Sequence, residues 1–154
     1  FSYIYNMKKL ILLLLFVPIV SCNQNLEKEK LKSVVETFFE GFHNKDSLVI
    51  NSVIDSSFNI NTTSFKKNGG ILRNINGANF VSAIISRPDS PVWEEKLFSF
   101  DIKIDEPLAN VWVDYEFWID DKLNHCGVNS IHLLKKKSGW KIFNISDSRR
   151  KDCN

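Results

Sequence analysis

The sequence predicts an α+β domain in which helices cover one face of an antiparallel sheet. Two observations support this prediction. Residues 26–43 repeat apolar side chains at the spacing of an amphipathic helix. Residues 109–150 contain three long runs of β-branched and aromatic residues, separated by the turn signals Asp120-Asp121 and Ser138-Gly139. Because helical patterns come first and strand patterns follow, the helices are expected to gather on one side of the sheet.

The length of the chain suits one domain. It has 154 residues, of which 44% are hydrophobic and 25% charged, enough for an ordinary core and too few for a second domain. No internal repeat or low-complexity segment is present.

The N-terminal residues resemble a bacterial lipoprotein signal. Met7 is followed by two lysines, an apolar run and the sequence Ile19-Val20-Ser21-Cys22, which is similar to a lipobox. We therefore expect residues 1–21 to be upstream residues and signal peptide, residues 22–25 a lipidated Cys22 with a short tether, and residues 26–154 the domain. The alternative is a plain signal peptide with a chance cysteine. A lipidated Cys22 predicts a protein of the bacterial cell envelope, anchored in the outer membrane and facing the periplasm.

The charge balance argues against a nucleic-acid partner. The net charge is +2 over the whole chain. Removal of the signal would take away Lys8 and Lys9 and leave equal numbers of basic and acidic residues. A neutral domain lacks the basic surface that binds phosphate backbones.

Further elements precede the three long strands. Asp46 or Ser47 can cap a second helix that ends near Asp55. The other expected elements are a strand over 58–65, a hairpin turn at 68–70, a return strand over 71–75, a short helix over 78–86 and a strand over 94–105.

Alternation divides the long strands into two faces. Val111, Val113, Tyr115, Phe117 and Ile119 form an apolar face, which we expect to line the interior. The opposite face carries Trp112, Asp114, Glu116 and Trp118. This aromatic and acidic surface fits a homodimer interface better than a catalytic pair of carboxylates. In the strand over 94–105, one face carries Leu97, Ser99, Asp101 and Lys103, and the other carries Lys96, Phe98, Phe100, Ile102 and Ile104. No inward Asp or Glu is identified on the long strands.

Cys126 and Cys153 are the cysteines that remain after Cys22. If Ser138-Gly139 is the hairpin turn, Cys126 faces residue 151, two positions from Cys153. We expect a disulfide between them in an oxidising compartment. Two free thiols or a thiol nucleophile are the alternatives.

The chain resembles the nuclear transport factor 2-like superfamily, whose cone-shaped fold is shared with ketosteroid isomerase, scytalone dehydratase and the polyketide cyclases. It is most similar to the bacterial branch described as lumazine-binding. The resemblance covers residues 26–150 and rests on the segments 111–117, 125–128, 139–142 and 147–150. It implies a strongly bent sheet of about six strands wrapped around a long N-terminal helix and two shorter helices, with a pocket at the open end. It also implies frequent dimerisation through the outer sheet face. Fold alone does not decide function, because the superfamily includes enzymes and non-enzymes.

The candidate site residues lie near the rim of the sheet. His125 and Asn129 share the inward face of their strand, and Asp147 and Arg149 come to the end of the last strand. The ligand-binding candidates are therefore Tyr115, Phe117, His125, Asn129 and Arg149. Arg149 could pair with Asp147 or could clamp a carboxylate or phosphate.

Three functions remain open at this stage. The first is a non-catalytic module that binds a small apolar or aromatic ligand. The second is an isomerase, dehydratase or cyclase that uses His125, Tyr115 and Asp147 as catalytic residues. The ketosteroid isomerase resemblance weakens here, because no inward acid is expected to partner Tyr115. The third is a dimeric interaction module. No cofactor is expected, and no cluster with metal-ligand spacing predicts a metal site.

Overall fold

The structure, a computed structural model, describes residues 24–153. It divides into two units, residues 1–30 and residues 31–154. Residues 24–30 of the first unit are helical. The predicted signal and Cys22 lie outside the described residues. None of the helices within residues 24–153 has the length and apolar character needed to cross a bilayer.

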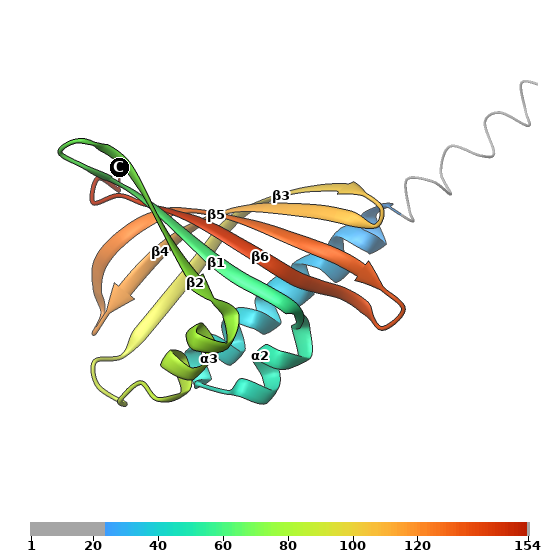
Figure 1. Ribbon diagram of the computed structural model, residues 1–154, viewed down its shortest axis with the longest axis horizontal. Helices are drawn as coiled ribbons and strands as arrows, with labels where there is room; N and C mark the ends of the chain where they lie inside the picture. The colour runs from blue at the N-terminus through green and yellow to red at the C-terminus, as the bar shows by residue number, and fades with distance from the viewer. Residues whose placement is uncertain (1–23, 154) are drawn as a thin grey trace, which may run out of the picture. The chain divides into compact units, whose positions relative to one another are not determined.

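The second unit begins with a helix over residues 31–44, which packs beneath the sheet (Figure 1). Its predicted apolar stripe is buried: Leu31, Val35 and Phe38 are almost fully inaccessible to solvent. Burial of this stripe stabilises the helix in place, because each large apolar side chain contributes about 1.5–3 kcal/mol on leaving water. The predicted helix is therefore confirmed in this region.

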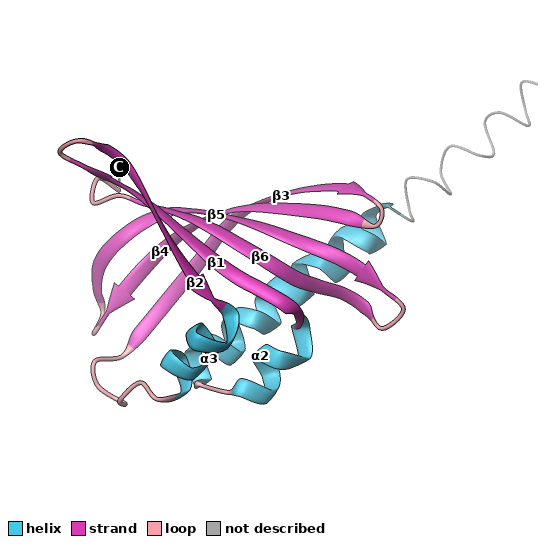
Figure 2. Ribbon diagram, in the orientation of Figure 1, coloured by secondary structure: helices cyan, strands magenta, loops and turns pink. Residues whose placement is uncertain are grey.

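Two shorter helices pack on the same side of the sheet (Figure 2). Helix α2 spans Ser47–Val53, and the Asp46 carboxylate caps it by accepting from the backbone amides of Leu48 and Val49. Helix α3 spans Gly77–Ile85 and is capped by the Asn76 side chain. Both caps satisfy amides that would otherwise lack a partner at the first turn.

The sheet has six strands in the order β2-β1-β6-β5-β4-β3. Their bounds are Ile54–Lys66 (β1), Gly69–Asn76 (β2), Trp93–Asp105 (β3), Leu108–Ile119 (β4), Lys122–Lys136 (β5) and Gly139–Arg149 (β6). The predicted meander of long antiparallel strands is confirmed in β3 to β6. The sheet is mixed rather than wholly antiparallel, because β1 pairs with β6 in parallel. Local patterns cannot reveal that pairing, since the two strands are distant in sequence.

A bulge in β3 reverses its two faces. Ser99 has a φ of 46°, and the register with β4 shifts between Phe98 and Phe100. Before the bulge Trp93, Glu95 and Leu97 are the partly buried residues, and after it Phe100, Ile102 and Ile104 are. The expectation that Phe98 shares the face of Phe100 is wrong: Phe98 is 45% exposed. The extra residue of a bulge shifts the alternation by one position, which turns Glu95 inward.

The C-terminal tail is joined to β5. Cys126 and Cys153 form a disulfide, with their Cα atoms 5.7 Å apart. Cys126 faces Arg150 rather than residue 151. The turn lies one residue earlier than expected, because Lys136 pairs with Gly139. The bulge between His132 and Leu133 then shifts the pairing by one residue, so the partner of Cys126 is one position earlier than expected.

Candidate functional site

A cavity of about 790 Å³ lies between the helices and the concave face of the sheet. Its size is within the range of roughly 300–1,000 Å³ that holds small ligands. One part of its wall is apolar and mostly aromatic: Phe38, Phe39, Phe42, Ile60, Phe65, Phe80, Ile84, Trp93, Phe117 and Ile145. The other part is polar: Glu95, Tyr115, Asn124, His125, Asn129, Asp147 and Arg149, with Ser64 and the tail residues Arg150, Lys151 and Asp152.

Glu95 is a carboxylic acid of the cavity with a strongly raised pKa. Its carboxylate accepts a hydrogen bond of 2.7 Å from the Asn129 amide. The pKa of Glu95 is raised to about 7, chiefly by burial and also by the charge of Asp147, while the hydrogen bond from Asn129 and the charge of Arg149 act in the opposite direction. The residue retains some accessible surface because it lines the cavity. Glu95 can therefore give or take a proton near neutral pH.

Asp147 is the centre of a hydrogen-bonded cluster. Its carboxylate accepts from Arg149 Nε at 2.7 Å and from Thr62 Oγ1 at 2.6 Å. The Tyr115 hydroxyl lies 3.3 Å from Asp147 Oδ2 and 3.0 Å from the Ser148 carbonyl. Burial and the negative charges of Asp147 and Glu95 raise the pKa of Tyr115, so the phenol stays protonated. Asp147 thus acts as an acceptor for donors that come from three strands.

His125 lies in the wall between two aromatic rings. Its ring stacks on Phe117 at 4.9 Å and meets Tyr115 edge-on at 5.7 Å. Its Nδ1 is 2.9 Å from Asn124 Oδ1. The pKa of His125 is lowered to about 4, chiefly by burial and also by the positive charges of Arg149 and Lys151, while the charge of Asp147 opposes this. The imidazole is therefore neutral at pH 7.

Gly127 lets this part of the sheet close around the cavity. A Cβ atom at this position would lie 1.7 Å from the Ser148 carbonyl oxygen and 2.9 Å from the Tyr115 ring. Only glycine permits so close an approach of β5 to β6, which brings the Tyr115 hydroxyl to Ser148.

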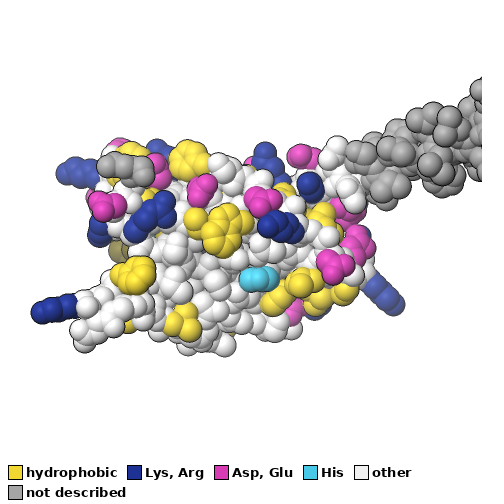
Figure 3. Space-filling model, turned by 90° about the horizontal axis from the view of Figure 1, so that it is seen from above, with side chains coloured by type: hydrophobic (Ala, Val, Ile, Leu, Met, Phe, Trp, Pro, Cys, Tyr) yellow, Lys and Arg dark blue, Asp and Glu magenta, His cyan; other side chains and the backbone are white. Residues whose placement is uncertain are grey.

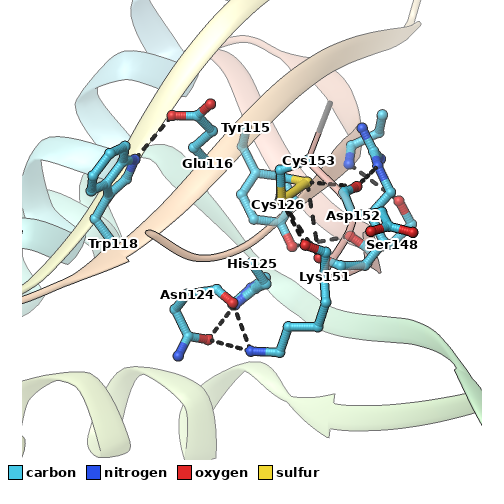
Figure 4. Close-up of a disulfide and its surroundings, with 12 residues drawn as sticks. Tyr115, Glu116, Trp118, Asn124, His125, Cys126, Ser148, Lys151, Asp152 and Cys153 are labelled. Carbon is cyan, nitrogen blue, oxygen red and sulfur yellow. Dashed lines mark hydrogen bonds between the residues drawn. A yellow bond between two sulfur atoms is a disulfide. The ribbon is translucent and has the colours of Figure 1, made fainter. Parts of the chain in front are cut away.

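The tail residues Arg150, Lys151 and Asp152 line part of the cavity. Figure 4 shows the tail beside Cys126 and Asn124, where the disulfide joins it to β5. Arg150 exchanges two backbone hydrogen bonds with Cys126, of 3.1 and 3.0 Å. Lys151 Nζ donates to the Asn124 carbonyl at 2.6 Å. The disulfide at Cys153 keeps these residues against β5.

The structure brings the sequence-derived candidates together. Tyr115, Phe117, His125, Asn129, Asp147 and Arg149 all line the one cavity. Asp147 and Arg149 form the ion pair that was one of the two expectations for them. The expectation that no inward acid accompanies Tyr115 is wrong, because Glu95 and Asp147 both line the cavity. The sequence of β3 did contain a signal for Glu95. Trp93 and Leu97 cannot lie on the same face as Phe100 under regular alternation, so their shared burial requires a bulge between them, and Glu95 then faces inward with Trp93 and Leu97.

The site offers groups for hydrogen bonding and proton transfer. Within residues 24–153 no three His, Cys, Asp or Glu side chains lie close enough to hold a metal ion. The polar groups instead supply a titratable acid, a neutral imidazole and a buried phenol beside an aromatic wall.

Searches of protein-family models and of curated proteins find no match to the sequence. Solved structures are similar in fold. An NTF2-like protein from Cytophaga hutchinsonii superposes with a TM-score of 0.65 at 11% identity, over 80% of this chain and 98% of that one. An NTF2-like protein with a cystatin-like fold from Novosphingobium aromaticivorans gives 0.69 at 8% identity, over 89% and 91%. An NTF2-like superfamily protein from Salmonella enterica gives 0.65 at 11% identity, over 85% and 96%. This chain therefore has the fold of the nuclear transport factor 2-like superfamily.

Proposed function

We propose that the cavity binds a small amphipathic ligand with an aromatic or apolar body. The observation behind this proposal is the division of the cavity wall into an aromatic part and a polar part. An apolar body placed against Phe38, Phe80 and Trp93 would leave water, and a polar end group would meet Glu95 or His125. Such a wall gives affinity through burial and orientation through a few hydrogen bonds.

Native mass spectrometry tests this proposal. Protein purified without denaturation is expected to carry, or to take up from a panel of bicyclic aromatic alcohols, one ligand per chain. Ser64→Trp should abolish uptake, because Ser64 lines the cavity without belonging to the buried core. Lys103→Trp, on the exposed face of β3, is the matched control. Equal uptake by the two variants, or no uptake by the unmodified protein, would contradict the proposal.

Proton transfer on the bound ligand is a second candidate function. It is favoured by the pKa of Glu95 near 7, the range in which a carboxyl group can act as general acid and base at neutral pH. If Glu95 is the general acid or base, Glu95→Gln should still bind the ligand. The rate of proton transfer on that ligand should fall by a factor of at least about a hundred. Unchanged turnover in Glu95→Gln would exclude Glu95 from this role.

Homodimerisation through the outer sheet face is an additional proposal. Trp112 is 51% exposed on this face, and Phe98 is 45% exposed beside it. Figure 3 shows apolar side chains on this side of the sheet interspersed with charged ones. Trp118 makes a hydrogen bond of 3.0 Å to Glu116 and holds Lys96 over its ring at 4.3 Å. Light scattering should give twice the monomer mass, and Trp112→Ser should reduce it. A monomer at high concentration would refute this proposal.

Envelope localisation rests on the lipobox-like segment that ends at Cys22. A lipid-anchored protein would present the cavity to the periplasm and meet ligands there. Metabolic labelling with palmitate tests this part of the proposal, with Cys22→Ser as the control.

A further inference from the structure

His125 presents its two ring nitrogens to different surroundings. Nδ1 contacts Asn124 Oδ1 at 2.9 Å. Nε2 makes no hydrogen bond with any group in residues 24–153, and it is not sealed from solvent. Because the ring lines the cavity, Nε2 is available to a ligand. Whether it accepts or donates a hydrogen bond there depends on which nitrogen carries the proton.

Lys151 determines which way the Asn124 amide points. Its ammonium lies 2.6 Å from the Asn124 carbonyl and 3.4 Å from Asn124 Oδ1 (Figure 4). An ammonium group can only donate, so it favours the amide oxygen on its side and disfavours the amide NH₂. Asn124 Oδ1 then faces both Lys151 and His125 Nδ1. Because an amide oxygen can only accept, His125 Nδ1 must carry a proton and donate to it. A neutral imidazole then leaves Nε2 as an acceptor.

Two features of the fold hold this arrangement. Phe117 pairs with His125 and Trp118 with Leu123, so Asn124 is the extra residue of a bulge in β5. A bulge re-aims a side chain, and here it brings Asn124 beside His125 instead of to the opposite face. The disulfide of Cys153 keeps the tail, and with it Lys151, against the same strand.

We propose that Lys151 and Asn124 hold His125 as the Nδ1–H tautomer, and that the cavity therefore selects ligands that donate a hydrogen bond, such as an aromatic hydroxyl, to His125 Nε2. Lys151 and Asn124 are positioning residues in this arrangement, and His125 is the residue that touches the ligand. The inference rests on the proposed ligand-binding function and specifies its ligand class.

The tautomer can be measured without any ligand. Nitrogen-15 spectra of the histidine side chains distinguish a protonated ring nitrogen from an unprotonated one, and His43→Gln and His132→Gln assign the signals. Unmodified protein should show His125 with a proton on Nδ1. Lys151→Met should shift the ratio of tautomers towards Nε2–H by about two- to tenfold, the effect of losing one ordinary hydrogen bond. Lys151→Arg should restore the ratio, and Lys137→Met, an exposed lysine at a hairpin turn, should leave it unchanged.

A pair of ligands tests the selectivity. 2-Naphthol can donate a hydrogen bond and 2-methoxynaphthalene cannot, while their apolar bodies are alike. The unmodified protein should bind 2-naphthol about two- to tenfold more tightly, and His125→Phe should abolish the preference while it preserves stacking on Phe117. Three results would overturn this inference alone. They are equal affinity of the unmodified protein for both probes, a preference for 2-naphthol that survives in His125→Phe, and an Nε2–H tautomer in the unmodified protein. Failure of both probes to bind would count against the proposed function itself.

Discussion

Replacing Glu95 by glutamine is expected to stabilise the protein above pH 7 and to change it little near pH 5. The carboxylate and the amide have almost the same shape, and the glutamine oxygen can still accept the hydrogen bond from Asn129. The substitution therefore removes the buried charge and little else. A buried carboxylate without full compensation is costly, whereas a buried neutral amide with a partner is not.

The magnitude follows from the pKa shift. Glu95 has a pKa of about 7 in the folded protein, against the ordinary value of 4.5 for a glutamate side chain. Because the folded pKa is higher, folding favours the protonated form, and the stability from this group is fully present below pH 4.5. It is lost as the pH rises through about 7. Each unit of pKa difference corresponds to about 1.4 kcal/mol, so the loss should be about 3 kcal/mol.

Urea unfolding with the disulfide intact measures this effect. Glu95→Gln should be about 3 kcal/mol more stable than the unmodified protein at about pH 8, and the difference should fall to below about 1 kcal/mol at about pH 5. Glu94→Gln, the exposed neighbour, is a matched control for the loss of one negative charge on the same strand. A stability difference for Glu95→Gln that is the same at both pH values would refute the reasoning.

Three further predictions concern the fold and the N-terminal segment. Gly127→Ala should lower the free energy of unfolding by about 3 kcal/mol, because its Cβ would lie 1.7 Å from the Ser148 carbonyl oxygen. Thermal unfolding checks this, and an unchanged midpoint would contradict it. Removing the disulfide by Cys126→Ser with Cys153→Ser should cost about 3 kcal/mol, since the bridge closes a loop with a sequence separation of 27. Denaturant unfolding with and without reductant measures the cost, and identical curves would refute it. Cells fed labelled palmitate should label the unmodified protein but not Cys22→Ser; label in both would exclude lipidation at Cys22.

The elements were predictable because each carries its own local pattern. The apolar stripe of residues 31–42 and the alternation of β4 decide which side is buried without reference to distant parts of the chain. The cap at Asp46 was recognisable for the same reason, since a short acidic side chain before an apolar run suits a helix start.

The parts that escaped prediction depend on irregular backbone or on distant pairing. Ser99 adopts a left-handed conformation without the glycine or asparagine that usually marks one, so the position of the bulge that turns Glu95 inward had no residue signal of its own, and only the change of apolar phase along β3 indicated it. The bulge at Asn124 was equally unmarked. The parallel partnership of β1 with β6 depends on contacts across the whole sheet. Consequently the candidates on β4, β5 and β6 were predicted, while the buried carboxyl group of Glu95 on β3 was not.

Calorimetric titration of the protein with 2-naphthol tests the central claim most directly, because it reports stoichiometry, affinity and heat capacity together. If the cavity is the binding site, one ligand should bind per chain with a negative heat-capacity change from burial of its apolar rings. Ser64→Trp should abolish the heat of binding, and Lys103→Trp should retain it. Binding that survives unchanged in Ser64→Trp would contradict the claim.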